Sequence, residues 1–242
     1  MSRVISVTSG KGGVGKSSFC CYLARALASQ GKSTVVVELD CGLRGLDIML
    51  GVSESVYDFG DLLSGRCELS DAVCPVPGTS NLFLIAAPSA FERFPTCDEV
   101  SFLCRRLKSK FDYIVIDTSA GYALTKIIPQ VSDQVLLIVT PDPVCVRDAS
   151  LVAGCLRQAG NQSVRLVINK VNRNTVRKEL MPDLDAVIDR VGVQLLGVIP
   201  EHREILFGSA KGLPLEPGRL PAKVFRAIAA RLDGEHVPLT VH

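Results

Sequence analysis

Short continuous runs of Val, Ile and Leu recur along this chain of 242 residues and predict buried β-strands. Strands that are apolar on both faces, rather than alternating between apolar and polar positions, are typical of a parallel sheet covered on both sides. We therefore expect a mostly parallel sheet. The predicted strands span residues 4–8, 34–39, 82–86, 113–116, 135–139, 164–168 and 195–199.

Amphipathic stretches of helical length separate these runs, and they predict helices over residues 16–29, 97–110, 147–159 and 175–191. Alternating strands and helices indicate an α/β fold, in which a doubly wound, mostly parallel sheet is flanked by helices and ligands bind at the carboxyl ends of the strands. No internal repeat or long linker interrupts the pattern, so we expect a single domain over residues 1–242.

The segment between the first predicted strand and the first predicted helix reads Gly-Lys-Gly-Gly-Val-Gly-Lys-Ser at residues 10–17. It satisfies the Walker A pattern, in which glycines let backbone N–H groups turn toward phosphate oxygens at a helix N-terminus. In this pattern Lys16 neutralises the β- and γ-phosphates, and the Ser17 hydroxyl coordinates Mg²⁺. The sequence therefore predicts a P-loop NTPase. The residues predicted to bind nucleotide here are Gly10, Lys11, Gly12, Gly13, Val14, Gly15, Lys16, Ser17 and Ser18.

Two aspartates end predicted strands and so face the same edge of the sheet as the P-loop. Asp117 follows Tyr-Ile-Val-Ile, a Walker B pattern of apolar residues and one acid, and Asp40 ends an earlier strand. We predict that Asp117 holds Mg²⁺ directly or through water, and that Asp40 belongs to the same metal site. The alternative is that each aspartate caps a following helix, which is a common structural role after a strand.

Composition is typical of a cytosolic globular protein. Hydrophobic residues make up 47% of the chain, yet no apolar run approaches the roughly 20 residues needed to cross a bilayer, and no signal-peptide pattern is present. The nine cysteines form no Cys-x-x-Cys pair, so we expect free thiols; a metal or iron–sulfur site shared between subunits is the alternative. The net charge of +2 does not by itself indicate a nucleic-acid partner.

Lys11 adds a second lysine to the Walker A pattern. With it, residues 11–16 resemble the deviant Walker A motif of the MinD/ParA ATPase family, which are P-loop NTPases of the SIMIBI type. In that family the first lysine reaches the phosphates of the nucleotide bound to the partner subunit and adds positive charge there, as an arginine finger does. The resemblance implies an ATP-dependent homodimer in which Lys11 and Lys16 are catalytic. It also implies that Asp40 helps to position the attacking water.

The resemblance follows the MinD branch of the family and covers nearly the whole chain. Residues 40–47, Asp-Cys-Gly-Leu-Arg-Gly-Leu-Asp, are similar to the MinD signature Asp-x-Gly-Leu-Arg-Asn-Leu-Asp, with Gly45 in place of Asn. Residues 117–121, Asp-Thr-Ser-Ala-Gly, are similar to the MinD segment Asp-Ser-Pro-Ala-Gly, with Ser119 in place of Pro. Without that proline the loop has more conformational freedom, which we expect to alter the rate of hydrolysis or the response to a partner.

Residues at two later strand ends are predicted to flank the base of the nucleotide. Asn169 and the pair Pro200-Glu201 each follow a predicted strand, and in the MinD-like fold both strand ends lie near the adenine. An Asn amide can pair with the N6/N7 edge of adenine, and so can the backbone near Pro200. The sequence Asn-Lys-Val-Asn at residues 169–172 lacks the aspartate with which GTPases read guanine. ATP is therefore favoured over GTP.

The C-terminal residues depart from the MinD pattern, in which a short basic amphipathic helix binds anionic membrane. The last predicted helix, residues 221–232, has the spacing of a domain-closing helix packed on the sheet. Residues 233–242 include two acids and a proline and do not predict a membrane helix. We expect a cytoplasmic protein, and we leave open a peripheral contact with the inner face of the cell membrane.

The leading functional hypothesis is a slow, partner-stimulated ATPase switch in septum placement. ATP closes a dimer, the dimer binds partners of the MinC and MinE type, and hydrolysis releases them. The alternatives are a soluble MinD-like regulator anchored by a protein partner and a ParA-like ATPase that partitions DNA. The near-neutral charge and the MinD-like signature count against DNA binding. A small-molecule kinase or an amide-forming enzyme could share the P-loop, but no separate substrate motif is visible.

Overall fold

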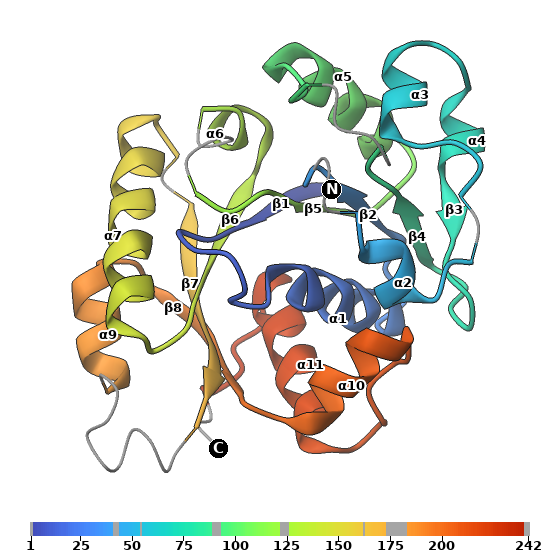
Figure 1. Ribbon diagram of the computed structural model, residues 1–242. Helices are drawn as coiled ribbons and strands as arrows, with labels where there is room; N and C mark the ends of the chain where they lie inside the picture. The colour runs from blue at the N-terminus through green and yellow to red at the C-terminus, as the bar shows by residue number, and fades with distance from the viewer. Residues whose placement is uncertain are drawn as a thin grey trace.

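The computed structural model describes the chain except for residues 1, 41–43, 54, 89–92, 122–125, 162, 173–182 and 240–242. Its described part contains one sheet in the order β3-β4-β2-β5-β1-β6-β7-β8, in which only the edge strand β3 is antiparallel to its neighbour (Figure 1). All seven predicted strands are present, so the predicted mostly parallel sheet is confirmed. The two-residue strand β3 was not predicted, because it is too short to give a pattern. The strands are β1 (Arg3–Thr8), β2 (Thr34–Glu38), β3 (Cys74–Pro75), β4 (Leu82–Ile85), β5 (Tyr113–Asp117), β6 (Gln134–Val139), β7 (Val164–Val171) and β8 (Leu195–Pro200).

The register of the central strands brings their carboxyl ends to one place. Val7 of β1 and Glu38 of β2 both lie opposite Asp117 of β5. These strands are buried along almost their whole length, as their continuous apolar sequences predict. The segments that follow β1, β2 and β5 therefore begin side by side at one edge of the sheet, and the P-loop is one of them.

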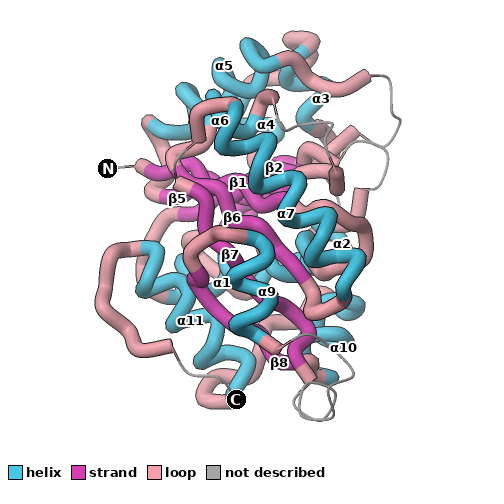
Figure 2. Tube along the Cα trace, turned by 90° about the vertical axis from the view of Figure 1, so that its left-hand side faces the viewer, coloured by secondary structure: helices cyan, strands magenta, loops and turns pink. Residues whose placement is uncertain are grey.

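The helices cover both faces of the sheet. Helices α1, α2, α10 and α11 lie on one side, and α5, α6, α7 and α9 lie on the other (Figure 1). Figure 2 gives a side view of α7 and α9, which pack against each other over β6 and β7. The described helices are α1 (Lys16–Ser29), α2 (Leu46–Leu50), α3 (Phe59–Leu63), α4 (Leu69–Ala72), α5 (Cys97–Lys108), α6 (Ile128–Val131), α7 (Pro143–Gln158), α9 (Leu184–Val191), α10 (Arg203–Lys211) and α11 (Leu220–Leu232).

One predicted helix start was wrong and one predicted helix is interrupted, and capping residues explain both. Helix α7 begins at Pro143, four residues before the predicted start, because Asp142 Oδ1 accepts a hydrogen bond from the Cys145 N–H at 2.9 Å. Helix α9 begins after Asp183, which has an extended backbone and caps the helix, so the helix predicted from residue 175 is not continuous there. Residues 175–182 of that prediction lie outside the described residues.

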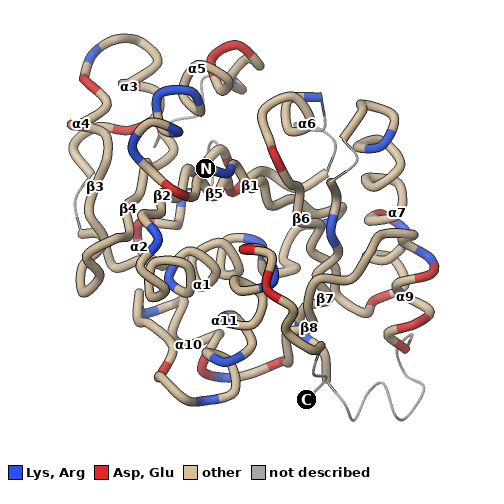
Figure 3. The backbone as a smooth tube through the Cα atoms, turned by 180° about the vertical axis from the view of Figure 1, so that it is seen from behind, with Lys and Arg blue, Asp and Glu red and all other residues tan. Residues whose placement is uncertain are grey.

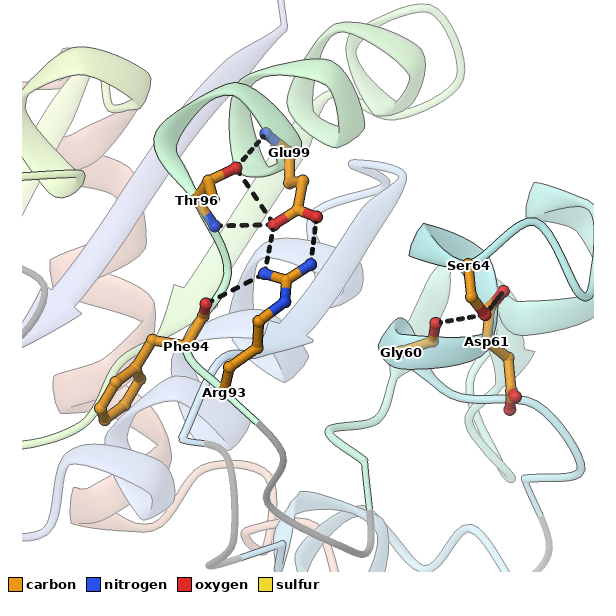
Figure 4. A network of polar contacts seen from close by, with 7 residues as sticks. All are labelled: Gly60, Asp61, Ser64, Arg93, Phe94, Thr96 and Glu99. Atoms are coloured by element: carbon orange, nitrogen blue, oxygen red, sulfur yellow. Dashed lines mark hydrogen bonds and ion pairs between the residues drawn. The ribbon is translucent and has the colours of Figure 1, made fainter.

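Helix α5 shows how a local sequence signal sets a helix start (Figure 4). Thr96 and Glu99 form a capping box, in which the Thr96 hydroxyl accepts from the Glu99 N–H and the Glu99 carboxylate accepts from the Thr96 N–H at 2.7 Å. Arg93 donates to both Glu99 carboxylate oxygens, at 2.6 and 2.9 Å, and this ion pair lowers the pKa of Glu99 to about 2. The helices that were not predicted, α2, α3, α4 and α6, have only four or five residues each, too few to reveal a helical period. The nine-residue helix α10 was also missed.

The last helix packs on the sheet, as its apolar spacing predicts. Helix α11 lies against α1 and β8, and the ring of Phe225 is 5.4 Å from the ring of Tyr22 between their centroids. The described residues beyond it, 233–239, are held against α11 by Arg231, whose Nε donates to the Val237 carbonyl at 2.9 Å. In the described part of the chain, no helix is both long enough and apolar enough to span a bilayer.

The eight described cysteines are free thiols, as predicted, and Cys41 lies outside the described residues. Four of the eight, Cys20, Cys21, Cys104 and Cys145, are buried. Burial raises the pKa of the Cys104 thiol to about 11, so it stays protonated and packs as a small apolar group. No three His, Cys, Asp or Glu side chains of the described residues are grouped closely enough to hold a metal ion by themselves.

Candidate nucleotide site

The P-loop connects the end of β1 to the first turn of α1, and three of its positions require glycine. Gly13 and Gly15 have φ angles of 77° and 93°, a left-handed conformation that costs other residues about 1 kcal/mol or more. At Gly10 a Cβ atom would lie 2.5 Å from the backbone carbonyl carbon of Asp148 in α7. Helix α7 therefore packs directly on the loop, and the loop backbone can curve around a ligand without side chains in the way.

The beginning of α1 is suited to binding an anion. No side chain caps this helix and its first turn has no acidic residue, so the N–H groups of Lys16, Ser17 and Ser18 keep no partner within the helix. Only 8% of Lys16 is exposed, and its ammonium group has no carboxylate within 4 Å among the described residues. Unpaired N–H groups, the helix dipole and a sequestered ammonium together favour a ligand with several anionic oxygens.

Asp117 brings a buried carboxylate to the same point. The residue is fully buried, and neither carboxylate oxygen has a hydrogen-bond partner among the described residues. Burial raises the pKa of Asp117; Lys16 gives the largest opposing effect, and Ser17 and Asp40 act on the same carboxyl group. Lys16, Ser17 and Asp40 thus lie near enough to Asp117 to act on its carboxyl group, and their roles in nucleotide and metal binding stay predictions.

These side chains fit a Mg²⁺ ion. An ionised carboxylate without a partner is costly to bury, and a hard cation would neutralise it. Magnesium in nucleotide sites is commonly held by one or two protein oxygens together with waters and phosphate oxygens, and Asp117 and Ser17 can supply the protein oxygens. Neither Asp40 nor Asp117 caps any of the described helices, so the alternative role in helix capping finds no support there.

Glu38, a buried acid in β2, was not predicted as a site residue. Glu38 Oε1 accepts from the Gly45 and Leu46 N–H groups at 2.8 and 3.1 Å, and Oε2 accepts from the Ala87 N–H at 3.1 Å. Burial raises its pKa, and these three hydrogen bonds counteract the rise. Glu38 therefore holds the backbone of Gly45 and Leu46, which end the segment that follows Asp40. The available signal was a lone acid directly after three valines in a predicted strand.

Lys11 has quite different surroundings from Lys16. Its side chain is 50% exposed, and its Nζ lies 3.5 Å from Oδ1 of Asp142, the N-cap residue of α7. It lines an open cleft of about 310 Å³ between the P-loop and the ends of β6, β7 and β8, and Lys16 is not in the described lining of that cleft. Within this chain, then, Lys16 lies at the floor of the site and Lys11 at its rim.

Residues at the end of β7 hold the P-loop from outside. Asn169 is buried, and its Nδ2 donates to the Val14 carbonyl at 2.7 Å. The Lys170 ammonium donates to the Gly13 carbonyl, also at 2.7 Å, from a backbone with a φ of 56°. No sequence motif indicates these two contacts. The Asn169 amide oxygen has no partner among the described residues, so it can still accept from the N6 amino group of adenine.

The end of β8 borders the same cleft. The Glu201 N–H donates to the Val171 carbonyl at 2.9 Å, and its carboxylate accepts from Asn172 at 3.0 Å. Glu201 lines the cleft, whereas Pro200 is paired with Val171 and is not in the described lining. The predicted adenine contacts of Asn169, Pro200 and Glu201 stay predictions, but these residues do lie near one another and near the P-loop.

Sequence comparisons identify relatives over almost the entire chain. A sequence model of the CobQ/CobB/MinD/ParA nucleotide binding domain matches residues 5–215. The septum site-determining protein MinD of Synechocystis is 34% identical over 246 residues, covering 98% of this chain and 92% of its own length. The MinD of Bacillus subtilis is 32% identical over 248 residues, covering 100% of this chain and 92% of its own length.

Solved structures with the same fold include two MinD proteins. The MinC:MinD cell division complex of Aquifex aeolicus matches with a TM-score of 0.92 and 28% identity, covering 100% of both chains. The septum site-determining protein MinD of Pyrococcus horikoshii, complexed with Mg-ADP, matches with a TM-score of 0.84 and 28% identity, covering 96% of both chains. The predicted doubly wound P-loop fold is thus confirmed.

Proposed function

Because this chain belongs to the CobQ/CobB/MinD/ParA family of nucleotide-binding proteins, we propose that it is an ATP-driven switch of the MinD type that regulates septum placement. Members of the MinD/ParA group are nucleotide-binding ATPases. One observation carries the proposal beyond nucleotide binding: the P-loop has one lysine at the floor of the site and a second, exposed lysine at its rim. We treat residues 1–242 as one domain, since a single cluster of buried side chains extends over the whole sheet.

We propose Mg²⁺ and ATP as the cofactor and the substrate. The P-loop N–H groups and Lys16 bind the phosphates, while Ser17, Asp117 and Asp40 hold the metal, directly or through water. The metal, when bound, neutralises charge on the β- and γ-phosphates. Asp40 orients the water that attacks the γ-phosphate, and the hydrogen bonds of Glu38 keep the neighbouring backbone in place. The relative from Pyrococcus horikoshii was solved with Mg-ADP, which supports this assignment.

We propose that Lys11 acts in the partner subunit of an ATP-bound dimer. Its exposed ammonium is paired only with Asp142 in the described part of its own chain, and an exposed ion pair of this kind contributes about 1 kcal/mol or less. Breaking that ion pair therefore costs little free energy compared with the free energy gained when the ammonium group contacts a triphosphate. Two Lys11 side chains exchanged across a symmetric interface would each complete the other subunit's site.

Protein partners of the MinC and MinE type are part of the same proposal. The solved relative from Aquifex aeolicus is a MinC:MinD complex and matches this chain over its full length. Lys and Arg are interspersed with Asp and Glu along the backbone drawn in Figure 3, and the net charge of the chain is only +2, which does not by itself indicate a DNA partner. We therefore prefer a protein partner to DNA. Contact with a membrane would be peripheral and could run through a partner.

The proposal predicts that ATP converts a monomer into a dimer. In light scattering with Mg-ATP, the mass should rise from 26.0 kDa to about twice that value, because both nucleotides are then enclosed by two subunits. With Mg-ADP, or with ATP and EDTA, the mass should stay that of the monomer. A mass that does not depend on the nucleotide would refute the switch.

Sedimentation with anionic vesicles, with and without a MinC-type partner, then distinguishes direct from partner-mediated anchoring.

Replacing Asp117 with asparagine should stabilise the nucleotide-free protein and abolish its response to Mg²⁺. The folded-state pKa of Asp117 is raised, so the buried carboxylate lowers the free energy of unfolding increasingly as the pH rises above the unfolded pKa of about 3.9. The neutral amide avoids this loss, and we expect Tm near neutral pH to rise by about 2–4 °C, the effect of about 1 kcal/mol in a domain of this size. Thermal unfolding at pH 4 and pH 7.5 checks the gain in Tm, which should be present only at the higher pH, and repeating it with Mg²⁺ at pH 7.5 checks the lost response to the metal. Equal Tm values for the two proteins at pH 7.5 would contradict the prediction.

A further inference from the structure

A second cavity lies at the other end of α1 from the P-loop. It has a volume of about 780 Å³, compared with about 310 Å³ for the cleft beside the P-loop. Helix α1 lines it with its C-terminal half, and α11, the end of α10 and the turn after β3 form the other walls. Figure 1 shows α1, α10 and α11 packed together on the face of the sheet that carries this cavity. Its volume lies within the usual range for small-molecule sites.

The walls of this cavity are apolar and its charges are all positive. Its apolar lining residues include Leu50, Phe225, Leu213, Pro214, Leu215 and Pro217. Arg25, Lys211 and Arg226 also line it, and no Asp or Glu belongs to its described lining. Lys211 and Arg226 are exposed at the mouth and have no ion-pair partner within 4 Å among the described residues.

Arg25 is the buried charge at this site. Only 9% of the residue is exposed, and its Nε atom has no hydrogen-bond partner among the described residues. Its Nη2 atom donates to the carbonyls of Leu50 and Gly212, at 3.1 and 3.0 Å, which end α2 and α10. Burial lowers the pKa of Arg25, and no carboxylate of the described residues lies within 4 Å of its guanidinium. The two helix ends offer partial negative charge, but the full positive charge has no counter-ion.

We propose that this cavity binds an anionic amphiphile, a molecule with an aliphatic body and one carboxylate or phosphate group. The aliphatic body lies against Phe225 and Leu215, where it leaves water. The anionic group pairs with Arg25 at the inner end, or with Lys211 and Arg226 as it enters. A guanidinium that already has two of its donors fixed is well placed to bind a carboxylate or phosphate with the others. The site is separate from the nucleotide site, so the proposal does not depend on the proposed function.

Titration calorimetry with decanoate, decan-1-ol and inorganic phosphate on the full chain tests this proposal. Decanoate should bind with one molecule per chain. Decanol lacks the anionic group and phosphate lacks the aliphatic body, so each should bind at least about tenfold more weakly than decanoate. A factor of ten in Kd is the effect of one charge-assisted hydrogen bond. Arg25→Gln should weaken decanoate binding by a similar factor. No binding of decanoate, or equal affinity for decanol, would overturn the proposal.

A pair of matched variants keeps the test independent of the contacts that Arg25 makes to α2 and α10. Ala222→Trp places a bulky side chain in the cavity and leaves Arg25 unchanged, whereas Ala210→Trp adds the same side chain at an exposed position outside the described lining. Decanoate binding should be lost in the first variant and retained in the second; equal binding by both would overturn the assignment of this cavity.

Vesicles of phosphatidylglycerol distinguish the source of the ligand. If the parent protein pellets with these vesicles and Ala222→Trp does not, the ligand is a membrane lipid. If the parent protein binds decanoate but does not pellet, the ligand is a free amphiphile.

Discussion

Replacing Lys16 with alanine is expected to weaken the binding of Mg-ATP by at least about 100-fold. Lys16 is the ammonium group at the floor of the site, and only 8% of it is exposed, so its interaction with phosphate is only weakly screened by water. Removing one partner of a buried ionic contact costs about 3–5 kcal/mol, and each 1.4 kcal/mol corresponds to a factor of ten. Calorimetric titration with ATP in the presence of Mg²⁺ measures the change in Kd.

The Lys16 variant needs a control for folding, because Lys16 also counteracts the burial of Asp117. Without the lysine, the pKa of Asp117 should rise further, and the variant should still give a cooperative unfolding transition. Lys223→Ala, which removes an exposed lysine from α11, should bind ATP as the parent protein does. A folded Lys16→Ala protein whose Kd lies within tenfold of the parent value would contradict the assigned role of Lys16.

The sheet and the nucleotide loop were predictable because each is determined by local sequence. A strand such as Thr34–Glu38 is apolar at every position but its ends, so its burial on both faces is visible without any knowledge of its neighbours. The P-loop was predictable because Gly13 and Gly15 adopt backbone angles that favour glycine, and because a strand precedes the loop and a helix follows it. Asp117 followed from its place at the end of a strand.

Contacts between distant segments could not be predicted in the same way. The amide of Asn169 and the ammonium of Lys170 hold P-loop carbonyls that lie more than 150 positions earlier in the sequence. The carboxylate of Glu38 reaches Ala87 through the folding of β4 beside β2. None of these partners has a fixed spacing along the chain, because the topology of the sheet alone brings them together. The start of α7 was misplaced for a different reason, since the local cap formed by Asp142 and Pro143 overrides the amphipathic pattern there.

Replacing Lys11 with alanine is expected to separate ATP binding by the monomer from ATP-dependent dimerisation and turnover, whereas Lys16 is needed for both. The Kd for monomeric Mg-ATP binding should change by less than about tenfold, because Lys11 is half exposed at the rim and pairs with Asp142 rather than with the core of the site. Dimerisation in ATP should be lost, and ATP turnover should fall at least about 100-fold, since a charge supplied in trans to a phosphoryl-transfer site is worth about 10³–10⁵ in rate. Light scattering and phosphate release measure the two effects.

The ion pair between Lys11 and Asp142 provides the matched control for this prediction. Asp142→Asn removes the same ion pair but keeps a good N-cap on α7, because an asparagine side chain can still accept from the Cys145 N–H. If Lys11 acts by pairing with Asp142 within one subunit, both variants should lose dimerisation and turnover to a similar extent. If Lys11 acts on the partner's nucleotide, Asp142→Asn should dimerise at least as well as the parent protein, because its Lys11 no longer has to leave a carboxylate. Retained turnover in Lys11→Ala, or equal losses in the two variants, would exclude a role for Lys11 across the interface.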